Sequence, residues 1–195
     1  DIQRLADRIG EIDALAILVN NAGFGTAGRF AETDVEGQTD MIQVHVVAAV
    51  RLARAALPGM IARGTGAVVN VSSVAGFMTG AGSVTYCATK AYLTSFSQSL
   101  HIELRGTGVR VQALCPGFVY TGFHDTPALE TFSRTQIPKF LWMSADFVVD
   151  NSLKALEKNR VICIPSWKYR LIVALVTRPL TGRMMRLYYR RGLKK

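Results

Sequence analysis

The chain has few residues that could build a disulfide framework or a metal site. Its three cysteines, Cys87, Cys115 and Cys163, lie far apart in apolar segments, and none has the spacing of a metal-binding motif. Buried, reduced thiols in a cytoplasmic protein are the expected state, and we predict no metal. No apolar run approaches the roughly 20 residues of a membrane-spanning helix. These absences argue against disulfide-stapled, zinc-binding and membrane-spanning classes.

Acidic residues are missing from the end of the chain. Residues 165–195 contain nine Lys and Arg and no Asp or Glu, so they account for the whole net charge of +9. The basic character therefore belongs to a tail on a neutral domain, and we predict no nucleic-acid partner. Two interpretations of 165–195 stay open: an amphipathic segment on an anionic membrane surface, or a basic helix pair that packs on the domain. We divide the chain into a domain, 1–164, and this helical tail.

What the sequence does contain is a globular α/β pattern. Hydrophobic residues make up 49% of the 195 residues and charged residues 19%, enough for one sizeable core. Apolar runs typical of buried parallel strands alternate with helical periodicity. We expect strands at 15–20, 67–71, 109–115 and 161–164, and helices at 1–10, 40–63, 83–105, 144–159, 167–177 and 180–191, with Thr33, Thr39, Ser83 and Ser144 as N-caps. This alternation predicts a doubly wound parallel sheet with helices on both faces.

Three turns follow the ends of predicted strands, at 20–23, at 72–73 and at 116–117. In such sheets ligands bind beyond the carboxyl ends of the strands. Segment 118–140 contains Pro127 and Pro138 and is typical of a lid over the site.

Three polar side chains stand in apolar surroundings near the second of these turns. Tyr86 and Lys90 are four residues apart and share one helix face. Twelve residues separate Ser73 from Tyr86, which lets a loop carry the serine back over that face. A hydroxyl, a phenol and an ammonium at a strand end can move a proton to or from a carbonyl oxygen.

Four motifs in one order resemble the short-chain dehydrogenase/reductase family. They are Asn20-Asn21-Ala22-Gly23, Asn70-Val71-Ser72-Ser73, Tyr86-x-x-x-Lys90, and Pro116-Gly117 with Thr121. The resemblance covers residues 1–165 and continues more loosely to the end. It implies a Rossmann-like fold and an NAD(P)-dependent oxidoreductase that interconverts a carbonyl and an alcohol by hydride transfer. It also implies a homodimer or homotetramer through helices 40–63 and 83–105. NADP is favoured over NAD.

The resemblance assigns roles to individual residues. Tyr86 is the general acid or base, and Ser73 holds the substrate oxygen. Lys90 and the positive charge of the oxidised cofactor together lower the pKa of the phenol, about 10 when free, and Lys90 binds the nicotinamide ribose. Seven further positions match cofactor-lining sites: Asn20, Ala22 and Gly23 at the adenosine ribose, and Pro116, Gly117, Val119 and Thr121 over the nicotinamide.

Two departures from the family pattern affect these expectations. His45 stands where the family has an asparagine that anchors a proton relay, and we count it among the candidate catalytic residues. Three interpretations stay open: it supports the relay, it disables the relay, or it is a helical histidine with no catalytic part. The glycine-rich phosphate loop, Thr-Gly-x-x-x-Gly-x-Gly, is absent. We therefore expect an N-terminally truncated fragment that lacks the first strands. As a fragment it should bind dinucleotide poorly and expose strand 15–20 as an apolar edge.

The substrate is predicted only by class. Phe118, Phe123, Leu141, Trp142 and Met143 lie on or near the predicted lid and favour a bulky, apolar carbonyl or alcohol. Two alternatives stay open: a catalytically impaired dinucleotide-binding protein, and a peripheral membrane protein of the same fold. The expected location is cytoplasmic, with membrane-surface contact through 165–195 as the alternative.

Overall fold

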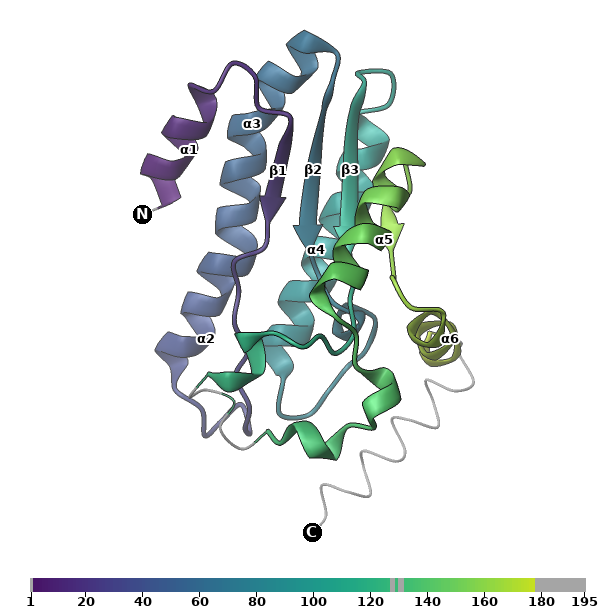
Figure 1. The fold of residues 1–195 in the computed structure, drawn as a ribbon. Helices are drawn as coiled ribbons and strands as arrows, with labels where there is room; N and C mark the ends of the chain where they lie inside the picture. The colour runs from purple at the N-terminus through teal and green to yellow at the C-terminus, as the bar shows by residue number, and fades with distance from the viewer. Residues whose placement is uncertain (1, 127–128, 130–131, 178–195) are drawn as a thin grey trace.

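The computed structural model describes residues 2–126, 129 and 132–177 and has a four-stranded parallel sheet at its centre (Figure 1). The strands lie side by side in chain order: β1 (Ile17–Asn20), β2 (Gly66–Val71), β3 (Val109–Leu114) and β4 (Ile162–Cys163). Asn20 pairs with Asn70, and Asn70 pairs with Ala113. The carboxyl ends of the first three strands therefore meet at one edge, as predicted.

The strands differ in how far they are covered. The apolar run of β2 is buried on both faces, with Val68 0% and Val69 4% exposed, which suits a central parallel strand. On β1 only Leu18 is buried, whereas Ile17 and Val19 are 43% and 54% exposed. The predicted apolar edge at 15–20 is confirmed.

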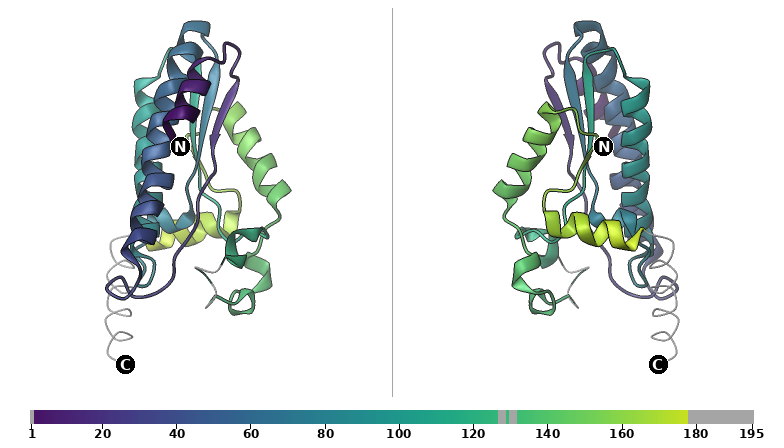
Figure 2. Two further views of the ribbon diagram at one scale, coloured as in Figure 1. Left: turned by 90° about the vertical axis from the view of Figure 1, so that its left-hand side faces the viewer. Right: turned by 90° about the vertical axis from the view of Figure 1, so that its right-hand side faces the viewer.

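Helices cover both faces of the sheet, as predicted. In the side views of Figure 2, α1 (Ile2–Gly10), α3 (Ala49–Arg63) and α4 (Val84–Glu103) lie on one face, and α5 (Ala145–Glu157) lies on the other. One core cluster, which includes Leu52, Met60 and Val111, fills the first interface. A second cluster, which includes Val69 and Leu156, fills the other. The sheet with its two helical layers is the Rossmann-like α/β fold.

The long helix begins earlier than predicted. It runs as α2 (Val35–Ile42), a π-helical turn (Gln43–Ala48) and then α3, and it ends at Gly64 as expected. The Asp34 carboxylate caps α2 by accepting from the Gly37 amide at 2.9 Å. Thr39, predicted as an N-cap, lies inside the helix and donates to the Val35 and Glu36 carbonyls. The cap prediction is wrong because a carboxylate five residues upstream satisfies the first free amides.

The helical run 35–63 is also unusually long and apolar. Within the described residues, 35–63 is the one helix that is long and apolar enough to cross a membrane by length and composition alone. In the fold it lies against the sheet with Leu52, Ala53 and Met60 buried. The burial identifies it as a core helix of this domain.

The remaining elements follow the prediction with small shifts at their ends. Ser144 caps α5 through the Phe147 amide at 3.2 Å, whereas Ser83 precedes α4 without a side-chain cap bond. Segment 118–140 contains short 3₁₀ turns, η3 (Gly122–Asp125), η5 (Arg134–Gln136) and η6 (Lys139–Leu141), and η2 (Val74–Phe77) follows β2. The last described helix is α6 (Trp167–Val176). The helix predicted at 180–191 lies outside the described residues.

Candidate active site

Hydrogen bonds join the carboxyl end of β2 to α4 and to the turn after β3. Ser73 Oγ accepts from the Ala75 amide at 3.1 Å and donates to the Pro116 carbonyl at 3.4 Å. Ser72 Oγ donates to the Lys90 carbonyl at 2.7 Å. These bonds fix the serine turn between α4 and the turn that follows β3.

Lys90 brings a buried ammonium to the same place. Its Nζ donates to the Val71 carbonyl at 2.9 Å and lies 5.6 Å from the centre of the Tyr86 ring. The residue is 4% exposed, and burial lowers the pKa of Lys90 to about 8. The predicted Ser73, Tyr86 and Lys90 set therefore meets at one strand end.

Tyr86 lies in the first turn of α4. Burial raises the pKa of Tyr86 to about 12, and a hydrogen bond with Ser73 opposes that rise. In the chain alone, desolvation of the phenolate outweighs the stabilising hydrogen bond, whereas the predicted lowering also depends on the charge of the oxidised cofactor. The phenol is therefore protonated at neutral pH, in the form that can donate a proton.

His45 lies inside the π-helical turn and borders the tyrosine. Its ring centre is 5.9 Å from that of Tyr86, and it is 1% exposed. Nε2 accepts from the Phe24 amide at 3.1 Å, and Nδ1 lies 2.9 Å from Thr89 Oγ1. Burial, and then the charge of Lys90, lower the pKa of His45 to about 3. The imidazole is therefore neutral.

The turn after β1 separates into an inward and an outward part. The Asn20 amide donates to Asn70 Oδ1 at 2.8 Å, and Asn70 donates to Ser97 Oγ at 2.9 Å. The Asn20 side chain thus belongs to a buried amide ladder, while Ala22 and Gly23 are exposed. The outward part of this turn is thus open to a ligand. A glycine-rich pyrophosphate loop is not part of the sequence.

The turn after β3 rests on a residue that sequence reasoning missed. Tyr169 on α6 packs so closely on Gly117 that a Cβ at position 117 would overlap its ring. The Tyr169 hydroxyl accepts from the Phe118 amide at 3.0 Å and donates to the Leu141 carbonyl at 2.8 Å. We predicted Tyr169 only as part of a basic tail, and a lone tyrosine 52 positions after Gly117 carries no signal for this contact. For α6 the structure favours packing on the domain.

Of the other residues of that turn, Pro116, Gly117 and Val119 are half-buried and Thr121 is exposed. Val119 forms a parallel bridge with Met143, and Thr121 Oγ1 accepts from the Phe123 amide at 3.3 Å. Of the predicted nicotinamide-covering residues, Pro116 thus contacts Ser73 through its carbonyl, whereas Val119 and Thr121 contact residues of the connection to α5.

Aromatic rings fill the space beyond Tyr86. We call them the aromatic cluster: Phe118, Tyr120, Phe123, His124, Phe132 and Trp142. Trp142 is at its centre, with ring centres 5.4 Å from Phe118 and 4.8 Å from Tyr120. Phe123 joins the cluster to Tyr86 at 6.0 Å. Three predicted substrate residues belong to the cluster, and Leu141 and Met143 flank Trp142 in the chain.

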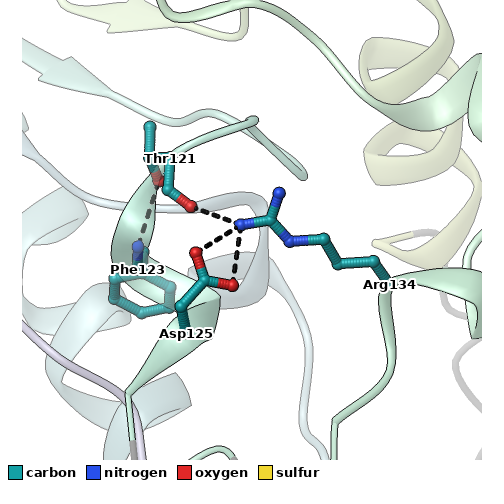
Figure 3. A network of polar contacts seen from close by, with 4 residues as sticks. All are labelled: Thr121, Phe123, Asp125 and Arg134. Carbon is teal, nitrogen blue, oxygen red and sulfur yellow. Dashed lines mark hydrogen bonds and ion pairs between the residues drawn. The ribbon is translucent and has the colours of Figure 1, made fainter.

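An arginine connects two parts of this region (Figure 3). Arg134 donates to both carboxylate oxygens of Asp125, at 2.8 and 2.7 Å, and to the Thr121 carbonyl at 2.8 Å. Its guanidinium also lies 5.7 Å from the Trp142 ring. The contact holds η5 against η3.

Known proteins are similar to this chain in sequence and in fold. The family model described as short chain dehydrogenase matches residues 1–129. The chain is 33% identical over 159 residues to the ketoacyl reductase HetN of Nostoc sp., and 34% identical over 161 residues to the oxidoreductase UcpA of Escherichia coli K12. Each match covers 82% of this chain, but only 53% and 57% of the relative. The chain thus spans about half the length of the curated relatives it matches.

Solved structures agree with the fold along the whole chain. A short-chain dehydrogenase from Sphingobium yanoikuyae, in complex with NADPH, has a TM-score of 0.78 and 30% identity, covering 100% of this chain and 70% of that one. The bulky-bulky ketone specific alcohol dehydrogenase from Comamonas testosteroni has a TM-score of 0.71 and 27% identity, with 100% and 68% covered. The comparisons support a nicotinamide dinucleotide as the cofactor of such a fold.

Proposed function

The chain belongs to the short-chain dehydrogenase family, and we propose that the intact protein interconverts a carbonyl and an alcohol by hydride transfer with NAD(P). One observation carries the proposal. Ser73, Tyr86 and Lys90, which come from two different elements, converge at the carboxyl end of β2. The catalytic roles of these residues belong to the proposal.

The chain's own side chains account for the movement of the proton. In the reducing direction the neutral Tyr86 phenol donates its proton to the carbonyl oxygen. The Ser73 hydroxyl rotates away from the Pro116 carbonyl, which is 3.4 Å away, and donates its hydrogen bond to the same substrate oxygen. The Lys90 ammonium, anchored on the Val71 carbonyl, stabilises the phenolate that is left. A bound nicotinamide dinucleotide supplies or accepts the hydride.

The cofactor would lie along the exposed strand-end turns. NADP is favoured over NAD, because the similar short-chain dehydrogenase from Sphingobium yanoikuyae has been solved with NADPH. We assign its contacts to Asn20, through its backbone, and to Ala22, Gly23, Tyr86, Lys90, Pro116, Gly117, Val119 and Thr121.

The aromatic cluster defines the substrate class. It begins at Phe123, which contacts the Tyr86 ring, and extends to Trp142. Aromatic walls beside a proton donor suit a bulky, apolar carbonyl or alcohol. A similar protein from Comamonas testosteroni is described as specific for bulky-bulky ketones, which supports this class.

A second candidate is contact with a membrane surface. Trp167 and Leu171, one turn apart on α6, are 64% and 54% exposed. Lys168 lies between them, and residues 178–195 add seven further Lys and Arg in the sequence. Such a segment fits an anionic lipid surface. Truncation after residue 177 removes the seven Lys and Arg but keeps Trp167 and Leu171, so it should lower sedimentation with anionic vesicles. Equal sedimentation would remove this candidate.

The oligomeric state also belongs to the proposal. Tyr92 and Ile102 on α4 are large apolar residues with 41% and 59% exposure. They suit the homodimer or homotetramer that was predicted through the two long helices. Light scattering on the intact protein tests this prediction, and a monomer would contradict it.

The central experiment is a variant of the proposed acid. The intact protein is screened with bulky ketones and alcohols and with both cofactors, while the reduced nicotinamide is followed by absorbance. Tyr86→Phe should lower kcat about 10²- to 10⁴-fold, because it removes the proton donor and keeps the ring. Tyr92→Phe, on the same helix but 41% exposed, is the matched control. Unchanged activity in Tyr86→Phe would overturn the mechanism, and dinucleotide binding without turnover would favour the impaired protein.

A further inference from the structure

Both ring nitrogens of His45 are used by the protein. The Phe24 amide at 3.1 Å is a donor and cannot accept, so Nε2 must present its lone pair. In a neutral imidazole the proton is then on Nδ1, which lies 2.9 Å from Thr89 Oγ1. The Thr89 hydroxyl donates its own proton to the Tyr86 carbonyl at 2.9 Å. Each hydrogen bond in this series therefore has one donor and one acceptor, and the assignments are mutually consistent.

The chain of bonds joins two distant segments. At one end is Phe24, which follows the turn after β1, and at the other end is the first turn of α4, which carries Tyr86. The π-helical turn at Gln43–Ala48 places His45 between them. The nearby Lys90 charge further disfavours a second proton on the ring.

Gly23 leaves the space that this ring occupies. A Cβ at position 23 would lie 2.6 Å from His45 Nε2 and 3.0 Å from its Cδ2. Contacts this short force one partner to move. The histidine at position 45 and the glycine at position 23 are therefore sterically paired.

We propose that His45 is a positioning residue: as a neutral imidazole it holds the turn after β1 against α4, the helix that carries Tyr86. It transfers no proton in the reaction. Its link to cofactor binding rests on the proposed function. With Nε2 bonded to Phe24 and Nδ1–H bonded to Thr89, neither nitrogen is available for a relay.

The tautomer gives a test that does not need turnover. Long-range proton–nitrogen NMR correlations of the ¹⁵N-labelled full chain report which ring nitrogen is protonated, and the signals that vanish in His45→Gln identify the residue. We expect the Nδ1–H pattern, unchanged between about pH 6 and pH 9. An Nε2–H pattern, or an imidazolium that titrates in this range, would overturn the proposal.

Kinetics of the intact protein separate positioning from proton transfer. His45→Phe keeps a ring but loses both bonds and should raise the KM for the cofactor about tenfold, with a smaller effect on kcat. His45→Gln retains one donor and one acceptor and should recover part of this loss. The pH profile of kcat/KM should keep its shape in both variants. A fall in kcat at constant KM, with an altered pH profile, would contradict the proposal.

The steric pairing is tested by a double-mutant cycle. Gly23→Ala should weaken cofactor binding in the wild type and weaken it less in a His45→Asn background, where the shorter side chain leaves room. Gly10→Ala on α1, where an added Cβ meets nothing within 4 Å, is the control. Additive effects would count against the pairing. An inactive wild type that shows the Nδ1–H pattern would contradict the proposed function. It would still support the role of His45 in joining Phe24 to Thr89.

Discussion

The two sides of Tyr86 are built from different interactions. Beneath it lies a polar floor, which we define as Asn20, Asn70, Ser72, Ser73, Lys90, Thr94 and Ser97, and in which hydrogen bonds to neighbours fix each side chain. Beyond it lies the aromatic cluster, whose members contact one another through ring faces and edges. Directional bonds set one geometry, whereas ring packing tolerates several. The floor is therefore suited to proton chemistry and the cluster to substrate recognition.

The two sides also belong to different parts of the fold. All floor residues lie on β1, β2 and α4 or on the turn that follows β2, next to the two core clusters. The aromatic cluster comes mainly from the connection between β3 and α5, which contains only short 3₁₀ turns among its described residues. A change in the connection can alter the substrate without disturbing the proton donor.

The largest change in the free energy of unfolding is expected from the loss of a side chain in the polar floor. Asn70 is 0% exposed and bonds to both Asn20 and Ser97. Asn70→Ala removes both bonds and leaves a cavity, so the free energy of unfolding should fall by about 3 kcal/mol. Chemical denaturation measures this. Asn21→Ala, at an exposed neighbour, should change it by less than about 0.5 kcal/mol, and equal losses would contradict a special role for the floor.

A pH-dependent effect of intermediate size should come from Lys90. Burial lowers its pKa from 10.5 to about 8, so between these pH values the unfolded chain binds more protons than the folded one. The contribution of Lys90 to stability therefore rises with pH in this window, by roughly 1.4 kcal/mol per unit at most. Lys90→Met should lack this rise. The measurement stops at about pH 9, since the raised pKa values of Cys87, Cys115 and Cys163 act in the opposite direction above their ordinary value of 9.0. Parallel stability curves for the two proteins would refute the assignment.

The sequence predicted the floor better than its surroundings. Apolar runs located the four strands, and strand-end motifs located Ser73, Tyr86 and Lys90, because local patterns encode both. The π-helical turn around His45 and the Tyr169–Gly117 contact escaped prediction, since both depend on packing between segments far apart in the chain. The burial that raises the pKa of Tyr86 in the chain alone escaped prediction for the same reason, because burial is a property of the assembled fold.

The smallest change in the free energy of unfolding should come from the Arg134–Asp125 ion pair beside the aromatic cluster. The side chains of Arg134 and Asp125 are 38% and 61% exposed, so their ion pair is screened by water. A single nitrogen of Arg134, Nη2, reaches both Asp125 and Thr121. Arg134→Lys keeps the charge, but its shorter side chain lacks this nitrogen and the planar guanidinium over the Trp142 ring. The free energy of unfolding should change by less than about 0.5 kcal/mol, while the KM for a bulky substrate rises and kcat stays constant. Arg29→Lys, in the exposed pair with Glu32, should leave both kinetic constants unchanged. A stability loss as large as that of Asn70→Ala would mean that the cluster is as rigid as the floor, and the contrast between recognition and chemistry would then fail.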